Sequence, residues 1–164
     1  MKRRLFIAAA GAAALLPTLF GRTGTAQTND GEATPAVTHS DDEWRELLND
    51  EQYSVLRREG TEAPGSSPLN YEKRAGTYVC AGCGQPLFRS DTKYDSGTGW
   101  PSFFEAIDGA LGTKIDYKIL WPRTEYHCAR CGGHQGHIFK DGPEPTGLRY
   151  CNNGVALRFI PAGD

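Results

Sequence analysis

The sequence predicts a mainly β domain with short helices at its amino end and a structural zinc site. Apolar residues recur at helical spacing only between Ser40 and Gly60. Beyond Gly60 the composition changes to glycine, proline, aromatic and β-branched residues in short runs, which is typical of antiparallel strands. Four of the five cysteines form two CxxC pairs, the spacing of a metal-binding knuckle. We expect this domain to span residues 40–164.

The amino-terminal residues have the layout of an export signal. Lys2-Arg3-Arg4 precedes an apolar run from Leu5 to Phe20, and Gly24-Thr25-Ala26 offers a cleavage site. The run falls short of the roughly 20 apolar residues that span a bilayer. We therefore expect residues 1–26 to be a signal peptide and the mature protein to have no stable membrane anchor.

The arginine pair in this segment suggests how the protein is exported. Arg3-Arg4-Leu5-Phe6-Ile7 resembles a twin-arginine signal, whose passengers cross the membrane already folded. Export after folding suits a zinc protein, because the thiols can bind metal in the cytoplasm before they meet an oxidising compartment. The alternative is an ordinary secretory signal with an incidental arginine pair. We expect a periplasmic protein in either case.

Removal of the signal excludes one class of partner. The first 26 residues contain four basic residues and no acidic residue, so the net charge falls from −2 to −6. Nucleic-acid binding by cysteine knuckles needs clustered lysine and arginine, and no basic stripe accompanies either pair. We expect no nucleic-acid partner and a monomeric protein.

The elements of the mature chain follow in order. Residues 27–39 contain few apolar groups and predict a disordered leader. Ser40 and Glu43 have the spacing of a capping box, and a short helix with an apolar face of Trp44, Leu47 and Leu48 follows.

A second helix follows the first. We expect Asn49 to cap it and Gly60 to end it. Its buried face would carry Tyr53, Val55 and Leu56. Four later runs predict strands: residues 77–80, 114–120, 137–139 and 155–160.

The cysteine pairs divide the five sulfurs into four and one. Cys80 with Cys83 and Cys128 with Cys131 can supply four thiolates to a tetrahedral zinc, which leaves no open position for a substrate. The 44 residues between the pairs mean that such a zinc would join two distant hairpins. The alternatives are two short disulfides, or one redox CxxC beside an unrelated pair. Zinc leaves Cys151 as the reactive candidate.

Cys151 needs neighbours to act as a nucleophile, because a free thiol has a pKa of about 8.5. Arg149 and Asn153 share its face if the segment is a strand, and they offer a positive charge and an amide donor. His134 and His137 follow the second knuckle, where zinc would hold them in place. Trp100, flanked by glycine and proline, is typical of the wall of a small apolar pocket. A thiol, an acid-base pair and an apolar wall together favour reduction of a small, partly apolar group.

Several short motifs give the chain its resemblance to a known family. They are Thr61-Glu62-Ala63-Pro64, Tyr78-Val79-Cys80-Ala81-Gly82-Cys83, Lys93-Tyr94-Asp95-Ser96-Gly97, Gly99-Trp100-Pro101-Ser102-Phe103, Cys128-Ala129-Arg130-Cys131, Gly136-His137-Ile138-Phe139, Asp141-Gly142-Pro143 and Arg149-Tyr150-Cys151. In combination they resemble the peptide-methionine (R)-S-oxide reductases, the type B methionine sulfoxide reductases. The matching stretches run from Leu48 to Phe159 and cover nearly the whole mature domain.

The resemblance implies a fold, a metal and an activity. It implies two antiparallel sheets in a tent-like arrangement with helices at the amino end, and one structural Zn²⁺ held by the four paired cysteines. It also implies reduction of the R epimer of methionine sulfoxide in oxidised proteins or peptides, with an external thiol such as a thioredoxin-like protein or a small thiol as reductant.

The resemblance further implies residue roles. Cys151 would attack the sulfoxide sulfur and become a sulfenic acid, while His137, assisted by His134, protonates the oxygen. Trp100 would pack the methyl group, and Asn153 would join the polar side of the pocket. The remaining substrate-binding positions are Arg149, Thr98 and Phe159.

The chain departs from the family pattern at two positions. Relatives often place a resolving cysteine where this chain has Thr98, so we expect a one-cysteine enzyme that an external thiol reduces directly. The family's Cys-x-Asn-Ser pattern becomes Cys151-Asn152-Asn153-Gly154, which removes a hydroxyl beside the nucleophile. Two rival functions remain: a zinc-stabilised binding module of the same fold without catalysis, and a cysteine hydrolase.

Overall fold

The computed structural model describes residues 35–163. The predicted signal peptide and residues 27–34 of the predicted leader lie outside this range. The leader's last residues contact the domain: the backbone N–H of Val37 donates to the carbonyl of Arg130 at 2.9 Å, and the Val37 side chain packs on the core. Val37, which belongs to the predicted leader, is therefore packed against the domain. No helix within the described range is long and apolar enough to cross a membrane.

The two predicted helices are present, as α1 (Asp41–Leu47) and α2 (Asp50–Arg58). Both begin with a capping box, Ser40 with Glu43 and Asn49 with Gln52, in which each side chain accepts a hydrogen bond from the other residue's backbone N–H. These reciprocal bonds satisfy amides that would otherwise have no partner within the helix.

Two details of the predicted helices are wrong. Leu47 does not belong to the buried face of α1: its side chain is 59% exposed, whereas Trp44 and Leu48 are buried. The left-handed residue that ends α2 is Glu59, with φ of 54°, and not Gly60. Gly60 leaves little room for a side chain, because a Cβ there would lie 2.8 Å from the Ser54 Oγ and 3.0 Å from the Ser54 carbonyl oxygen.

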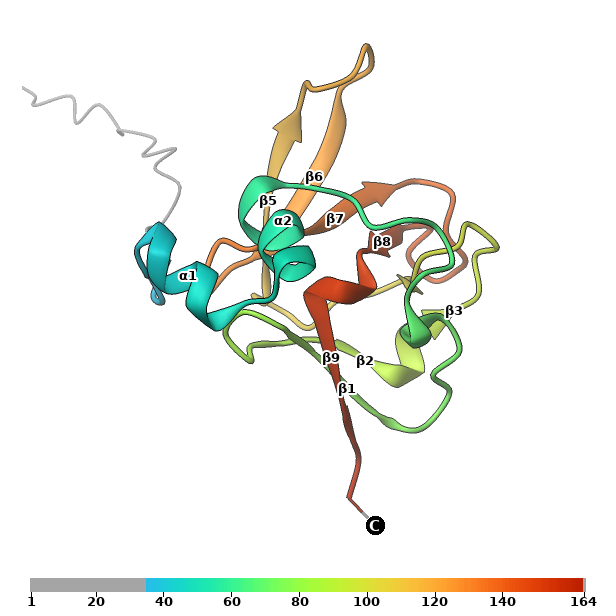
Figure 1. Ribbon diagram of the computed structural model, residues 1–164. Helices are drawn as coiled ribbons and strands as arrows, with labels where there is room; N and C mark the ends of the chain where they lie inside the picture. Colours follow the sequence, from blue (N-terminus) through green and yellow to red (C-terminus); the bar gives the residue numbers. More distant parts are fainter. Residues whose placement is uncertain (1–34, 164) are drawn as a thin grey trace, which may run out of the picture. The chain divides into compact units, whose positions relative to one another are not determined.

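Within residues 35–163, nine strands form two antiparallel sheets, as the resemblance implied (Figure 1). The strands are β1 (Gly76–Cys80), β2 (Pro86–Arg89), β3 (Lys93–Tyr94), β4 (Ser102–Phe103), β5 (Leu111–Asp116), β6 (Arg123–Cys128), β7 (His134–Phe139), β8 (Arg149–Asn152) and β9 (Leu157–Pro161). The smaller sheet has the order β2-β1-β9, and the larger one has the order β3-β4-β8-β7-β6-β5. The described part of the chain is therefore mainly β, with two short α-helices.

The predicted strands are found with shifted ends. Residues 77–80 and 137–139 lie inside β1 and β7. The run 114–120 is strand only to Asp116, because the chain turns there into the β5–β6 hairpin. The run 155–160 begins as a 3₁₀ turn, η3 (Gly154–Ala156), before β9.

Aromatic side chains fill the core between the elements. Phe88 of β2 stacks on Phe103 of β4 with ring centroids 4.2 Å apart, and Tyr126 of β6 meets both Phe88 and Tyr150 edge to face. Tyr78, Phe88, Phe103 and Tyr126 are fully buried. Such rings contribute large apolar area, and their geometry fixes how the strands face one another.

Candidate active site and metal centre

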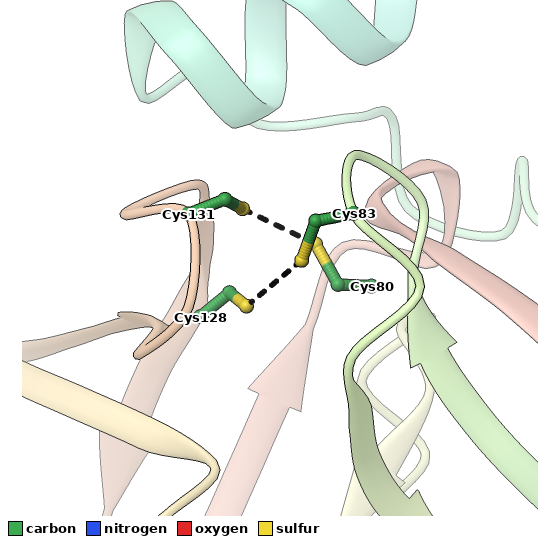
Figure 2. A group of neighbouring side chains, drawn as sticks. All are labelled: Cys80, Cys83, Cys128 and Cys131. Carbon is green, nitrogen blue, oxygen red and sulfur yellow. Dashed lines mark hydrogen bonds between the residues drawn. The ribbon is translucent and has the colours of Figure 1, made fainter. Parts of the chain in front are cut away.

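The four paired cysteines converge on one point (Figure 2). All four sulfurs lie within 4.8 Å of one another, and the Cys80–Cys131 and Cys83–Cys128 pairs are 3.7 and 3.5 Å apart. A tetrahedral zinc with Zn–S bonds of about 2.3 Å places its sulfurs about 3.8 Å apart. The donor set and spacing therefore fit Zn²⁺. The cysteines are free, so the two short disulfides are not found, and because both pairs meet in one cluster neither CxxC is unrelated to the other.

The cluster joins the two sheets. Cys80 ends β1 of the smaller sheet, and Cys128 ends β6 of the larger one. In each knuckle the residue after the second cysteine is a glycine with positive φ, Gly84 at 74° and Gly132 at 67°. The N–H of each glycine donates to the carbonyl of the first cysteine, at 2.9 and 2.8 Å. A metal held here would be structural, because the four protein ligands complete its coordination.

Cys151 lies in β8, in the middle of the larger sheet. Its cross-strand partners are His137 of β7 and Ser102 of β4. Gly136, next to His137, lets the two strands approach closely, since a Cβ there would lie 1.9 Å from the Cys151 carbonyl oxygen. The thiol is half-buried, and the register places an imidazole directly beside it.

A cavity of about 230 Å³ opens beside this strand pair. Its lining combines a thiol, an imidazole, a guanidinium, an amide and aromatic rings; the residues are Thr61, Trp100, Arg123, Gly136, His137, Phe139, Cys151 and Asn153. Drug-sized ligands occupy about 300 to 1,000 Å³. The cavity therefore suits the end of a single side chain.

Opposing effects act on the Cys151 thiol. Burial raises its pKa, while the guanidinium of Arg149 and hydrogen bonds from Thr98 and Arg149 lower it in part. Arg149 is held by two hydrogen bonds of 2.8 Å to the carboxylate of Asp141. The resting cysteine is thus a thiol, with a fixed cation and a hydroxyl ready to stabilise the thiolate when it forms.

His137 is positioned by an acid. Its Nε2 lies 2.8 Å from Oδ2 of Asp116, which also accepts from Arg123 at 2.6 Å. Because a carboxylate only accepts, the neutral imidazole carries its proton on Nε2. Burial lowers the pKa of His137, and the hydrogen bond to Asp116 offsets part of that effect. The carboxylate is therefore the group that favours the protonated imidazole.

His134 lies behind His137, with ring centroids 5.5 Å apart, and does not line the cavity. Its Nδ1 is 2.6 Å from Glu125, whose other oxygen is 3.1 Å from His127. Burial raises the pKa of Glu125, but hydrogen bonds from the two histidines outweigh it and bring the pKa to about 2. Glu125 is thus ionised although it is buried, and it fixes the imidazole of His134.

The loop that begins at Thr61 holds the opposite wall. The carbonyl of Glu62 accepts from Trp100 Nε1 at 3.2 Å, and its N–H donates to Oδ1 of Asn153 at 3.0 Å. The Glu62 carboxylate accepts the backbone N–H groups of Gly154 and Val155 at 2.6 and 2.8 Å. One residue therefore binds three parts of the site: the indole, the amide and the turn after the nucleophile strand.

The residues of this site all lie within the segment that matches a known family. The family model described as the SelR domain matches residues 48–161, which include every residue that lines the cavity and all four clustered cysteines. The chain belongs to the SelR family.

Relatives of the SelR domain carry an enzyme's name. A protein of Methanosarcina barkeri named "Peptide methionine sulfoxide reductase MsrB" is 53% identical over 128 residues, or 77% of this chain and 90% of the relative. A protein of the same name from Agrobacterium fabrum is 52% identical over 129 residues, or 78% of this chain and 96% of that protein. These relatives favour an oxidoreductase over a binding module or a hydrolase.

Among solved structures, the Mis18 'Yippee-like' domain matches 56% of this chain and its own full length, with 17% identity and a TM-score of 0.44.

The structure gathers most of the site residues predicted for this SelR domain. Cys151, His137, Trp100 and Asn153 share the cavity. Thr98 and Arg149 act on the thiol from outside its lining.

Phe159 is not brought to this site. It lies in β9 of the smaller sheet, where its ring meets Tyr78 with centroids 5.0 Å apart and the guanidinium of Arg74 with its carbon 5.4 Å from the centroid. The phenylalanine that lines the cavity is Phe139 of β7. Phe159 is therefore not part of the cavity that holds Cys151.

Two acids of the SelR site were not predicted from the sequence. Asp116 and Glu125 are buried, at 8% and 2% exposure, and each positions a histidine. A signal was present, because carboxylates within strands of a buried sheet are costly unless they are paired. Glu62 was noted only as part of a motif.

Glu62→Ala is expected to lower both stability and activity. Two buried N–H groups, those of Gly154 and Val155, would lose their acceptor, which costs about 2 kcal/mol and lowers the melting temperature. The turn that holds Asn153 would loosen, so kcat should fall more than KM rises. Glu62→Gln, which keeps one acceptor, should recover part of both. Equal kcat values for Glu62→Ala and the wild type would contradict this role.

Proposed function

We propose that the protein reduces the R epimer of methionine sulfoxide in proteins and peptides, with Cys151 as nucleophile and an external thiol as reductant. The observation that carries the proposal is the convergence of Cys151, His137 and Trp100 on one side-chain-sized cavity. Family membership supports methionine sulfoxide as the substrate group.

The first step transfers the oxygen atom to Cys151. The Cys151 thiol gives its proton to His137, and the thiolate sulfur forms a bond to the sulfoxide sulfur while the imidazolium passes that proton to the oxygen. The oxygen then moves to Cys151: a bond from Sγ to the oxygen forms as the S–O bond of the sulfoxide and the new S–S bond break, so methionine leaves and Cys151 is a sulfenic acid. The two electrons that reduce the sulfoxide come from the cysteine sulfur. Arg149 and Thr98 stabilise the thiolate, and Asp116 holds the imidazole in position and stabilises its protonated form when it forms.

The second stage restores the thiol. One reductant thiol displaces the hydroxyl of the sulfenic acid, which releases water and leaves a mixed disulfide on Cys151. A second thiol attacks this disulfide, which frees Cys151 and an oxidised reductant. Thr98, which interacts with the Cys151 thiol, stands where a resolving cysteine would act, and the other four cysteines are clustered in the metal site.

The selectivity for one epimer of the sulfoxide follows from the two unlike walls of the cavity. The sulfoxide sulfur carries an oxygen, a methyl group and the side-chain methylene. Trp100 offers an apolar face for the methyl group, while His137 and Asn153 offer polar groups for the oxygen. With the chain end directed out of the cavity, only one epimer places both groups correctly.

The four-cysteine cluster would hold one structural Zn²⁺. Its contribution is to clamp the two sheets, and it takes no part in the reaction. The β6–β7 connection carries the second knuckle and leads directly into the strand of His134 and His137. A metal bound there would therefore fix the start of β7, the strand that carries His137.

The test of this function is turnover of the separate epimers of a blocked methionine sulfoxide, with dithiothreitol as reductant. We expect turnover of the R epimer and a kcat/KM for the S epimer lower by at least about 10²-fold, since the wrong epimer leaves polar groups unpaired. Equal turnover of the two epimers, or turnover of the S epimer alone, contradicts the proposal.

We further propose that the protein acts after export as a monomer in the periplasm. The twin-arginine pattern and the cleavage site at residues 24–26 support export. Amino-terminal sequencing of the protein from a fractionated periplasm tests this. We expect it to begin at Gln27, and an uncleaved chain in the cytoplasm alone would contradict export.

A further inference from the structure

The β5–β6 hairpin projects beyond the neighbouring strands (Figure 1). Its tip carries a cluster of exposed apolar side chains. Tyr117, Ile119, Leu120 and Trp121 are 75%, 48%, 93% and 76% exposed. We call these four residues the apolar tip. Single exposed hydrophobic residues are common, but a contiguous cluster marks a surface that binds something.

The tip is not needed to hold the hairpin in place. The hairpin has its own anchor on the helical part, where the carboxylate of Glu59 pairs with Lys114 at 2.5 Å and with Lys118. Ile115, in β5 of the same hairpin, is also exposed, at 52%, whereas the remaining large exposed hydrophobic residues of the described chain lie singly on other elements: Leu47, Tyr71 and Ile160. Exposed hydrophobic residues thus accumulate at the apolar tip. Packing within the domain does not explain their presence, because their side chains stay exposed.

Residues of the active site flank the apolar tip on both sides in the chain. Asp116, immediately before it, accepts a hydrogen bond from His137, and Arg123, immediately beyond Pro122, lines the cavity. Arg123 and Trp121 are two residues apart, so their Cα atoms are within about 7 Å of each other. A polypeptide with one side chain in the cavity can therefore reach the tip with its neighbouring residues.

The chemistry of the tip indicates the kind of segment it would take. The charge of Lys118 is already paired with Glu59, so the tip offers apolar and aromatic surface without a free charge of its own at that position. Methionine is among the residues most often buried in proteins, so the residues around it in a damaged protein are commonly apolar. Those neighbours become exposed when the damaged segment opens.

We propose that the apolar tip binds the apolar polypeptide segment that flanks the methionine sulfoxide under repair. This inference rests on the proposed function, because the segment is defined by the sulfoxide in the cavity. It assigns the hairpin a role in choosing among protein substrates. A blocked amino acid has no flanking segment and therefore does not use the tip.

The test compares three substrates with dithiothreitol: a blocked R-sulfoxide, a peptide with Ser and Gly around the sulfoxide, and a peptide with Leu and Val at the two positions on each side. For the wild type we expect kcat/KM to be about tenfold higher on the apolar peptide, through KM, since covering one or two large side chains suffices for this effect. Leu120→Ser/Trp121→Ser should lose this preference and keep its kcat/KM on the blocked sulfoxide.

Leu47→Ser is the matched control, because Leu47 is also exposed and lies in α1, outside the cavity lining. It should behave as the wild type on all three substrates. An equal kcat/KM of the wild type for the two peptides, or a preference that survives the double substitution, overturns the proposal. A wild-type dimer that becomes monomeric in the double variant, or vesicle binding lost in it, assigns the tip to a second copy or to a lipid surface and also overturns it. A wild-type protein that does not turn over the blocked R-sulfoxide would instead contradict the proposed function.

Discussion

Cys151→Ser is expected to abolish reduction of methionine sulfoxide, with kcat/KM lower by at least about 10³-fold. A serine hydroxyl is far less acidic than a thiol and cannot accept the oxygen as a sulfenic acid. The substitution keeps the size of the side chain, which lies at a half-buried position in β8. The measurement is turnover of a blocked R-sulfoxide by the purified variant with dithiothreitol.

Two controls separate chemistry from folding in this variant. Its melting temperature should stay close to that of the wild type, because the thiol makes no contact that the fold depends on beyond the interactions with Thr98 and Arg149. Its zinc content should also be unchanged, since Cys151 is outside the four-cysteine cluster. A folded variant that keeps a tenth or more of the wild-type rate would show that another group carries the reaction.

Cys128→Ser is expected to release the metal and unfold the domain at ordinary temperature. A structural zinc contributes an apparent binding free energy of about 10 to 16 kcal/mol, which equals or exceeds the roughly 5 to 15 kcal/mol that stabilise a typical domain. Cys128 ends β6, and its partners Cys80 and Cys83 belong to the other sheet's knuckle, so the loss separates the two sheets.

Metal analysis and circular dichroism check this expectation. The wild type should hold one zinc per chain and melt cooperatively, whereas Cys128→Ser should hold no zinc and show no cooperative transition. Cys151→Ser serves as the matched cysteine substitution, with zinc retained. A metal-free Cys128→Ser variant that melts at the wild-type temperature would contradict the clamping role.

Local signals in the sequence predicted local structure well. Both capping boxes and the strand at residues 77–80 are found, because caps and short periodic runs depend on neighbours in the chain. The four-cysteine cluster was also predicted, because two CxxC pairs have the ligand spacing of a structural zinc site. Leu47 was misplaced because apolar spacing does not show where the partner surface ends.

The acid partners of the histidines depend on strand register, which the sequence does not display. Asp116 reaches His137 across β6, which lies between their strands, and Glu125 reaches His134 from the neighbouring strand. Phe159 was assigned to the substrate site on resemblance alone, and its strand belongs to the other sheet. Glu62 acts through backbone groups of residues that lie about 90 positions away, as its hydrogen bonds to Gly154 and Val155 show.

One cysteine, Cys151, is expected to carry the whole redox cycle. Mass spectrometry of the protein after one equivalent of R-sulfoxide, with reductant withheld, tests it most directly. We predict that the peptide containing Cys151 gains one oxygen, or the adduct of a sulfenic-acid trap such as dimedone, while the four clustered cysteines stay unmodified. An intramolecular disulfide between Cys151 and any other cysteine would contradict the account.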